Sequence, residues 1–276
     1  MCELLCVSSL LPTTVSITLE RLARHGALGQ ANVDGWGLAA YDGLDVRLYK
    51  EPEPAGQSAW LGFILGRELE ASLTMSHIRR ASQGALTHAN TQPYARELDG
   101  RMHVFAHNGD LHGLERLAGP GPRRFTPIGQ TDSELAFCIL LQRLAPLWTH
   151  AKAPTVKDRL QVVEAFAADI RLLGTANFLY ADGDLMFAHG HRRPPYVDGR
   201  GRPGLWRLEQ HCALNPAALA AHGVTIGHRD GQEISLIASV PLTEDAWVSF
   251  ATGEIVVLRQ GRLARDLRMA DIPARG

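Results

Sequence analysis

Short apolar or alternating runs recur along the chain and predict β-strands. A period of two residues is the mark of a strand with one buried face. The runs occupy residues 2–8, 36–41, 46–49, 73–78, 102–106, 177–181, 185–189, 205–209, 233–240 and 254–258. The sequence Asp42-Gly43-Leu44-Asp45 joins two of them, which predicts a hairpin over residues 36–49.

Apolar residues at helical spacing mark four further segments, which are residues 15–25, 57–70, 132–144 and 156–173. The strands follow one another in groups around a central helical pair, which favours antiparallel sheets with helices outside. Proline and glycine concentrate at residues 119–127 and 194–204 without apolar periodicity, so both are predicted to be surface loops. The pattern predicts an α+β fold in a single domain, residues 1–276.

Composition is that of an ordinary globular protein. The chain has 276 residues, 45% hydrophobic and 21% charged, and a formal net charge of -1. With no basic surplus, nucleic acid and anionic membrane are not expected partners. Four cysteines without a CxxC pair are too few for a disulfide scaffold, and no apolar run is long enough for a signal peptide or a spanning helix. A cytoplasmic location is expected.

Cys2 is the first candidate for chemistry. Removal of Met1 would leave one residue that carries both a thiol and a free α-amine. Because the α-amine titrates near pH ~7.7 to 8.0, it can take the proton of the thiol close to neutrality. The alternative is a buried structural cysteine on the first strand, which is the commoner role of a free cysteine.

Two polar clusters stand at the ends of predicted strands. Arg79 follows the strand at 73–78, and its guanidinium can hold a carboxylate through two parallel hydrogen bonds. Asn108 and Gly109 follow the strand at 102–106, where a side-chain amide and a backbone N–H can stabilise a developing oxyanion. Alone, Arg79 would be a surface charge and Asn108-Gly109 a turn.

Two further clusters complete a possible site. Asp132 opens the helix at 132–144 and can accept an ammonium group, while Thr131 and Glu134 have the spacing of a capping box. Asp34-Gly35-Trp36-Gly37 enters a strand with glycines that let backbone approach closely. Each is more often only a cap or a tight turn. With a thiol, a carboxylate clamp and an oxyanion pair, they form the parts needed to bind free glutamine and attack its side-chain amide.

Six motifs, in order along the chain, resemble those of class II glutamine amidotransferase domains. They are Met1-Cys2-Glu3-Leu4, Asp34-Gly35-Trp36-Gly37, His77-Ile78-Arg79, Asn90-Thr91-Gln92-Pro93-Tyr94, His107-Asn108-Gly109 and Thr131-Asp132-Ser133-Glu134. Over nearly its full length the chain is similar to the compact stand-alone amidotransferase-like proteins of bacteria. The resemblance implies the N-terminal nucleophile hydrolase fold, a four-layer αββα sandwich of two antiparallel sheets between helical layers.

The resemblance implies catalytic roles for Cys2, Asn108 and Gly109. Cys2 would be the nucleophile and its freed amine the general base. The Asn108 side chain and the Gly109 backbone N–H would form the oxyanion hole. Attack on glutamine would give a γ-glutamyl thioester with loss of ammonia, and water would then release glutamate.

The resemblance also implies three substrate-binding residues. Arg79 would clamp the α-carboxylate, Asp132 would accept the α-ammonium, and Ser82 would lie near the substrate. The chain departs from the family pattern at two positions. Arg80 stands where synthase members commonly carry tryptophan, and Gln92 stands where many relatives carry histidine, so Gln92 is assigned no catalytic role.

No cofactor or metal is implied, because the chain lacks a phosphate-binding GxxxxGK[ST] motif and His189-Gly190-His191 is too small a cluster for a metal. The expected substrate is glutamine, and another γ-glutamyl amide is an alternative. The ammonia acceptor is expected on a separate synthase partner, since the chain has little room for one. A catalytically silent glutamine-sensing or partner-binding module, and a cysteine–histidine protease using His77 or His107, are the remaining alternatives.

Overall fold

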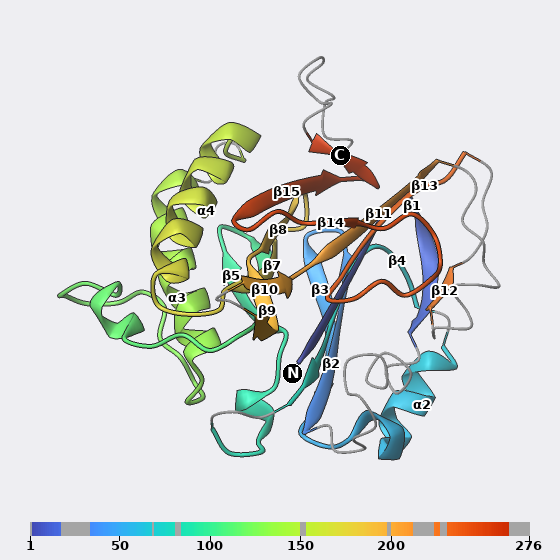
Figure 1. The fold of residues 1–276 in the computed structure, drawn as a ribbon, viewed down its shortest axis with the longest axis horizontal. Helices are drawn as coiled ribbons and strands as arrows, with labels where there is room; N and C mark the ends of the chain where they lie inside the picture. Colours follow the sequence, from blue (N-terminus) through green and yellow to red (C-terminus); the bar gives the residue numbers. More distant parts are fainter. Residues whose placement is uncertain are drawn as a thin grey trace.

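Two antiparallel sheets stack face to face, with helices on their outer faces (Figure 1). The computed structural model describes residues 2–17, 34–67, 69–80, 84–149, 153–197, 200–211, 224–226 and 231–264. We call the sheet that contains the first strand sheet I and the other sheet II. Every strand pair in both sheets is antiparallel. The predicted four-layer α+β architecture is confirmed in its two sheets and outer helices.

Sheet I has the strand order β14-β11-β13-β1-β4-β2-β3, and β12 pairs with the distal part of β1. Its strands are β1 (Glu3–Ile17), β2 (Gly35–Asp42), β3 (Asp45–Glu51), β4 (Glu70–Arg79), β11 (Trp206–His211), β12 (Val224–Ile226), β13 (Glu233–Ala238) and β14 (Val248–Ser249). The first strand is therefore central, with β4 on one side and β13 on the other.

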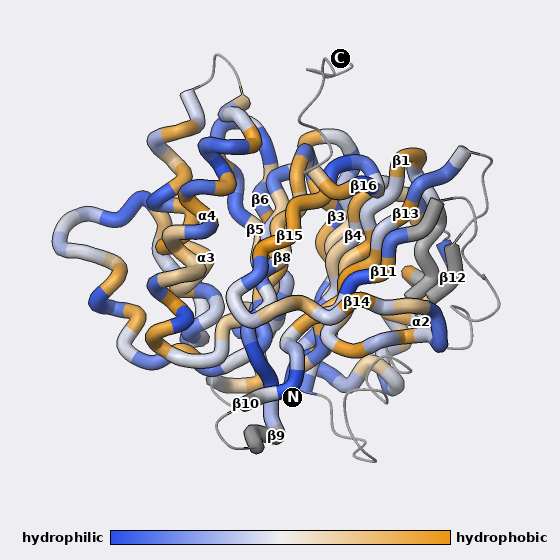
Figure 2. Tube along the Cα trace, turned by 45° about the horizontal axis from the view of Figure 1, so that its top comes forward, coloured by the Kyte–Doolittle hydropathy of each residue, from blue (hydrophilic) through white to orange (hydrophobic). Residues whose placement is uncertain are grey.

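Sheet II has the order β16-β15-β8-β7-β6-β5. Its strands are β5 (Tyr94–Leu98), β6 (Arg101–Asn108), β7 (Asn177–Ala181), β8 (Met186–Gly190), β15 (Glu254–Arg259) and β16 (Arg262–Leu263). A separate hairpin of β9 (Arg192–Val197) and β10 (Arg200–Pro203) follows β8. It lies beside the start of β1 in both views of the chain (Figures 1 and 2).

Three α-helices belong to the described residues, α2 (Ala59–Leu65), α3 (Asp132–Leu144) and α4 (Val156–Arg171), and short 3-10 turns connect other elements. The α3 and α4 helices cover the outer face of sheet II, and α2 lies beside sheet I (Figure 1). Side chains cap their first turns, since Ser58, Thr131 and Thr155 accept hydrogen bonds from backbone N–H groups inside α2, α3 and α4.

The period of two along each strand separates the core into layers. In β1, Leu4 and Cys6 point between the sheets and pack with Val104 and Ala106 of β6. The alternate residues, Leu5 among them, join the cluster of α2 on the other face. A third cluster lies between sheet II and the helices α3 and α4. In Figure 2 hydrophobic segments accordingly run along β15, β1 and their neighbours.

Most predicted elements are confirmed. The hairpin at residues 36–49 is β2–β3, joined by the predicted turn, and the predicted helices at 132–144 and 156–173 are α3 and α4. The predicted helix at 57–70 is shorter, as α2. Six strands have no predicted counterpart: β5, β9, β10, β12, β14 and β16.

Two predictions are wrong. The helix expected at residues 15–25 does not begin there, because residues 15–17 pair with β12 as the end of β1; residues 18–25 lie outside the described part. The surface loop expected at 194–204 contains most of the β9–β10 hairpin, and Arg193 beside it is buried. Proline and glycine are compatible with a short two-stranded ribbon, whose edges need no continuous ladder.

In the part of the chain described, no helix combines the length and apolar character needed to cross a membrane. Among the same residues, no group of three or more histidine, cysteine or acidic side chains could hold a metal ion. Cys2, Cys6 and Cys138 are free thiols. Cys212 lies outside the described residues.

Buried histidines make the stability of the fold depend on pH. Burial lowers the pKa of His77 and His189 to about 3 and that of His103 to about 4. An unfolded histidine titrates near pH ~6.5. Below that pH the unfolded chain binds protons that the folded chain does not. The contribution of these histidines to the free energy of unfolding is therefore complete above pH ~6.5 and is lost as pH falls toward the folded-state values of about 3 to 4.

We expect the free energy of unfolding in urea to fall between pH ~6.5 and ~4, by up to about 1.4 kcal/mol per pH unit for each such histidine. His103→Gln should reduce that slope. His112→Gln, the same change at an exposed position, is the matched control. A free energy that stays flat over this range would contradict the assignment.

Candidate active site

The ends of β1, β4 and β6 meet at one end of the space between the sheets. Leu4 and Cys6 of β1 point into this space, and the same alternation places Cys2 there. On β4, Met75 points into the space, so Arg79 has the same orientation. Asn108 at the end of β6 follows Val104 and Ala106. Three predicted site residues from two sheets thus share one layer.

The Cys2 sulfur is bound to the backbone that follows β4. The Arg80 N–H donates to Sγ at 3.1 Å, and the thiol reaches the Arg80 carbonyl oxygen at 3.3 Å. Burial raises the pKa of the Cys2 thiol to about 11, and the Arg80 hydrogen bond and the Arg79 charge oppose the rise. The thiol is therefore neutral at pH 7 and needs a base beside it to become a nucleophile.

Asn108 connects the two sheets directly at Cys2. Its side-chain Nδ2 donates to the Cys2 carbonyl oxygen at 2.5 Å. The next residue must be glycine, because a Cβ on Gly109 would lie 1.9 Å from the Thr175 carbonyl oxygen. The predicted oxyanion pair therefore stands at the end of β6, with its amide N–H directed at the candidate nucleophilic residue.

His107 and Gln92 hold this end of β6 in place. The Gln92 side chain accepts from His107 N–H at 2.6 Å and donates to the His107 carbonyl at 3.1 Å. The His107 ring contacts Ser133 Oγ at 2.9 Å and the Thr175 carbonyl at 3.0 Å. Both residues are buried. Gln92 thus replaces a strand partner beside Asn108, a supporting role that sequence reasoning did not assign.

The two candidate histidines, His77 and His107, do not form a catalytic pair with Cys2. His77 is fully buried, and neither of its ring nitrogens has a hydrogen-bond partner. The ring of His107 is engaged by Ser133 and Thr175, and burial lowers its pKa. Within the described residues, the sulfur of Cys2 is bound to the Arg80 backbone instead. Neither His77 nor His107 therefore supplies the pairing with Cys2 that the cysteine–histidine protease alternative requires.

Arg79 is buried, and its guanidinium holds the loop that follows it. It donates to the carbonyl oxygens of Gly84 at 3.2 Å and Ala85 at 3.5 Å. The Asn90 side chain continues the link, donating to the Ala85 carbonyl and accepting from Gln130 N–H. The loop after β4 is thereby tied to the segment that enters α3.

Asp132 stands at the N-terminus of α3 and faces the segment after Gly109. Its two carboxylate oxygens accept backbone N–H bonds from Leu111 and Ser133, each at 2.7 Å. An acidic side chain is favourable at a helix N-terminus. The half-buried carboxylate is therefore fixed in place while it keeps further acceptor capacity for an ammonium group.

The capping box at the start of α3 is only half formed. Thr131 Oγ1 accepts from Glu134 N–H at 3.2 Å, as expected for the cap. The Glu134 carboxylate instead accepts from Ile128 and Gly129 N–H and pairs with Arg96. Glu134 therefore stabilises the loop that leads into the helix.

The structure brings most of the predicted site residues into one region. Cys2 and Asn108 are in direct contact. The loop that follows Arg79 and the segment that precedes Asp132 are joined through Asn90 and Gln130. Ser82 lies outside the described residues. The supporting role of Gln92 was missed, because a lone buried amide carries no sequence signal that separates it from a turn residue.

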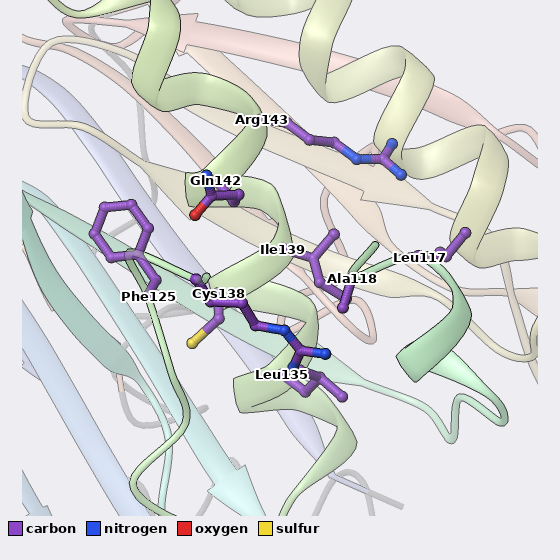
Figure 3. Close-up of a pocket in the computed structure, with 9 residues that line it drawn as sticks. Leu117, Ala118, Phe125, Leu135, Cys138, Ile139, Gln142 and Arg143 are labelled. Carbon is purple, nitrogen blue, oxygen red and sulfur yellow. The ribbon is translucent and has the colours of Figure 1, made fainter. Parts of the chain in front are cut away.

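A pocket of about 320 Å³, partly open to solvent, lies elsewhere on the molecule (Figure 3). It is formed by α3 and the preceding loop, with Cys138 and Phe125 among the labelled side chains. None of the predicted site residues lines it. Burial raises the pKa of the Cys138 thiol to about 11, which leaves this cysteine unreactive at neutral pH.

We expect Gln92→Leu to lower the free energy of unfolding by about 1 to 3 kcal/mol, because it leaves the buried N–H of His107 without an acceptor. Urea unfolding measures the change. Gln142→Leu makes the same substitution at an exposed position and should stay within about 0.5 kcal/mol of the wild type. Equal effects of the two changes would show that Gln92 does not support β6.

Comparisons with known proteins give the family. The sequence model described as "Glutamine amidotransferases class-II" matches residues 1–274. An uncharacterised protein of Methanocaldococcus jannaschii is 31% identical over 277 residues, which covers 99% of this chain and 73% of that protein. The 2.0 Å crystal structure of a protein from Pseudomonas aeruginosa, predicted to be a glutamine amidotransferase, is 29% identical, covers 95% of this chain and 98% of that one, and has a TM-score of 0.72.

A more distant structure shares the fold. Glutamine phosphoribosylpyrophosphate amidotransferase of B. subtilis is 15% identical, with a TM-score of 0.56 over 95% of this chain and 48% of that chain. Its likeness supports the N-terminal nucleophile hydrolase fold expected from the sequence. With the family model matched over almost every residue, the chain belongs to the class II glutamine amidotransferase family.

Proposed function

We propose that this protein is a glutaminase of the amidotransferase type, with Cys2 as an N-terminal nucleophile. Once Met1 is removed, the freed α-amine takes the thiol proton as the sulfur attacks the side-chain amide carbon of glutamine. The C–N bond then breaks and the nitrogen leaves as ammonia with that proton. Water hydrolyses the resulting γ-glutamyl thioester, releasing glutamate and restoring the thiol.

The contact from Asn108 Nδ2 to the Cys2 carbonyl is the observation that carries the proposal. The amide donor contacts the backbone of the residue that carries the sulfur, which supports a role for Asn108 in stabilising the tetrahedral oxyanion. The Gly109 N–H follows it in the turn that Thr175 restricts to glycine. One such donor contributes about 3 to 4 kcal/mol to transition-state stabilisation.

A neutral Cys2 thiol needs a base in this mechanism. With the pKa of Cys2 raised to about 11 by burial, a base must take the proton during the attack. Neither His77 nor His107 is hydrogen-bonded to the sulfur within the described residues, which leaves the residue's own amine as the candidate base. Its proximity to the thiol is covalently fixed.

Arg79 and Asp132 would bind the two charged groups of the substrate backbone. The buried Arg79 guanidinium would take the α-carboxylate, and the Asp132 carboxylate would take the α-ammonium. Ser82 would complete this side of the pocket. Opposite charges held on separate elements, β4 and α3, favour an amino acid over a simple amide.

In this proposal residues 1–276 form one amidotransferase domain in the cytoplasm, without a cofactor. The ammonia passes to a separate synthase partner that supplies the acceptor. Hydrolysis of another γ-glutamyl amide would use the same contacts, because the γ-glutamyl half of the substrate is the part that they recognise. Comparing glutamate release from glutamine and from N-substituted γ-glutamyl amides decides between the two.

The proposal is tested by measuring glutamate and ammonia release from glutamine. We expect Cys2→Ala to abolish both, because the proposed thioester forms on the Cys2 sulfur. Cys6→Ala removes a neighbouring buried thiol of the same strand and should retain turnover. Release of glutamate by the Cys2→Ala protein would refute the mechanism.

We expect Asn108→Ala to lower kcat by about 10²- to 10³-fold, because one oxyanion donor is lost. Steady-state kinetics give the change, and circular dichroism checks that the fold is retained. If the variant turns over glutamine at the wild-type rate, Asn108 has no role in the oxyanion hole.

We expect Arg79→Lys to raise KM for glutamine, because a single ammonium cannot reproduce the paired hydrogen bonds of guanidinium to carboxylate. Arg47→Lys, at an exposed ion pair with Asp42, is the matched control and should leave KM unchanged. A KM that stays the same in both variants would remove Arg79 from the substrate site.

A further inference from the structure

The catalytic end of the molecule contains a second connection between the sheets, centred on Arg193. This residue is the second of the β9 strand and is buried. Its guanidinium donates to Glu3 Oε1 at 2.8 Å, to Glu3 Oε2 at 3.4 Å and to the Ser239 carbonyl at 2.6 Å. Glu3 is the residue that directly follows Cys2. Arg193, which belongs to the β9–β10 hairpin and not to sheet I, is thus bound to the start of β1.

Ser239 is also hydrogen-bonded to β1, through its side chain and its backbone. Its hydroxyl accepts from Leu4 N–H and its own N–H donates to the Leu4 carbonyl, each at 3.0 Å. Ser239 follows β13, the neighbour of β1 in sheet I. The guanidinium of Arg193 therefore holds two adjacent parts of sheet I, the Glu3 side chain and the backbone after β13.

Asn177 fixes the other end of the connection to sheet II. It stands on β7 directly opposite Asn108 of β6. Its Nδ2 donates to the carbonyl oxygens of Asn108 at 3.2 Å and Arg192 at 2.9 Å, and its Oδ1 accepts from His191 N–H at 2.7 Å. The backbone that carries Arg193 is therefore bound to the same residue that contacts Asn108.

The connection is entirely buried. Glu3 is 2% exposed, Arg193 5%, Ser239 1% and Asn177 0%. Burial raises the pKa of the Glu3 carboxyl, and the Arg193 charge opposes that rise. Because desolvation offsets most of the attraction in a buried ion pair, such a pair is weak evidence for stability and is better explained by a need for defined geometry.

We propose that Arg193 is a positioning residue that sets the register of Cys2 against Asn108. The sulfur and the oxyanion donor come from different sheets, and a displacement of about 1 Å between reacting groups can cost about 10²-fold in rate. The path from Asn108 through Asn177, Arg192 and Arg193 to Glu3 holds Cys2 at the separation that the direct contact between Asn108 and Cys2 requires.

The proposal rests on the proposed function for its kinetic test and has a structural test that does not. We expect Arg193→Met to lower kcat about 10- to 100-fold with KM changed by less than about threefold, since the groups that would bind the substrate remain. In its crystal structure, the contact from Asn108 Nδ2 to the Cys2 carbonyl should be lost. Arg193→Lys, which keeps the charge without the forked geometry, should give an intermediate kcat.

A matched pair of variants separates positioning from stability. Glu3→Met combined with Arg193→Met removes the whole ion pair, so no unpaired charge is left buried and the fold should be retained. If Arg193 positions Cys2, kcat stays low in this folded double variant. Arg159→Met breaks an equally buried pair with Asp182, at the far end of β7, and should lower stability while leaving kcat unchanged.

The outcomes are distinct. Wild-type kcat in the double variant, or an intact 2.5 Å contact in the Arg193→Met crystal structure, would overturn the positioning role. So would an equal loss of kcat in Arg159→Met. Absence of glutaminase activity in the wild-type protein would refute the proposed function, while the crystal structure of Arg193→Met would still decide the role of Arg193.

Discussion

The hydrogen bond from Asn108 to the Cys2 carbonyl joins the two sheets at the point where their strands end, and the surrounding structure is arranged to keep it. Cys2 enters sheet I at its centre, and Asn108 leaves sheet II at the end of β6. The Gln92 side chain is hydrogen-bonded to the backbone of His107, just before Asn108. The backbone oxygen of Gln92 lies so close to Gly37 that a Cβ there would be only 2.1 Å from it. Side chains from both sheets therefore determine where the candidate nucleophile lies.

Buried polar groups concentrate at this end of the fold, and their energetics differ from those of the core. Burial keeps His77 neutral, raises the pKa of the Cys2 thiol and raises that of Glu3. Each buried polar group has a desolvation cost that hydrogen bonds only partly offset. A fold that needed stability alone would place apolar residues here. The buried polar groups at this end indicate a site where protonation states and distances matter more than the free energy of unfolding.

The elements that depend on short-range sequence patterns could be predicted from the sequence. The turn between β2 and β3, the capped helix α3 and the strand that ends at Asn108 all follow from local periodicity and turn chemistry. The motifs singled out Cys2 and Asn108 as candidates, and the structure brings these two residues into contact. Contacts between residues far apart in the sequence could not be predicted in this way. Residues 15–17 form a strand because β12 pairs with them. Arg193 is buried in an ion pair with Glu3, which lies 190 positions earlier. A proline- and glycine-rich segment such as 194–204 gives no sign that its neighbour carries an ion pair into the interior.

The central claim is that Cys2 acts as an N-terminal nucleophile, and one measurement tests it directly. The protein produced in its native host is analysed by intact mass before and after exposure to diazo-oxo-norleucine, an electrophilic mimic of glutamine. We expect Met1 to be absent and a single adduct to form on Cys2, with none on Cys6 or Cys138, which are buried. A protein that retains Met1 and forms no adduct would refute the role of Cys2 as nucleophile and would leave a binding module on an amidotransferase fold.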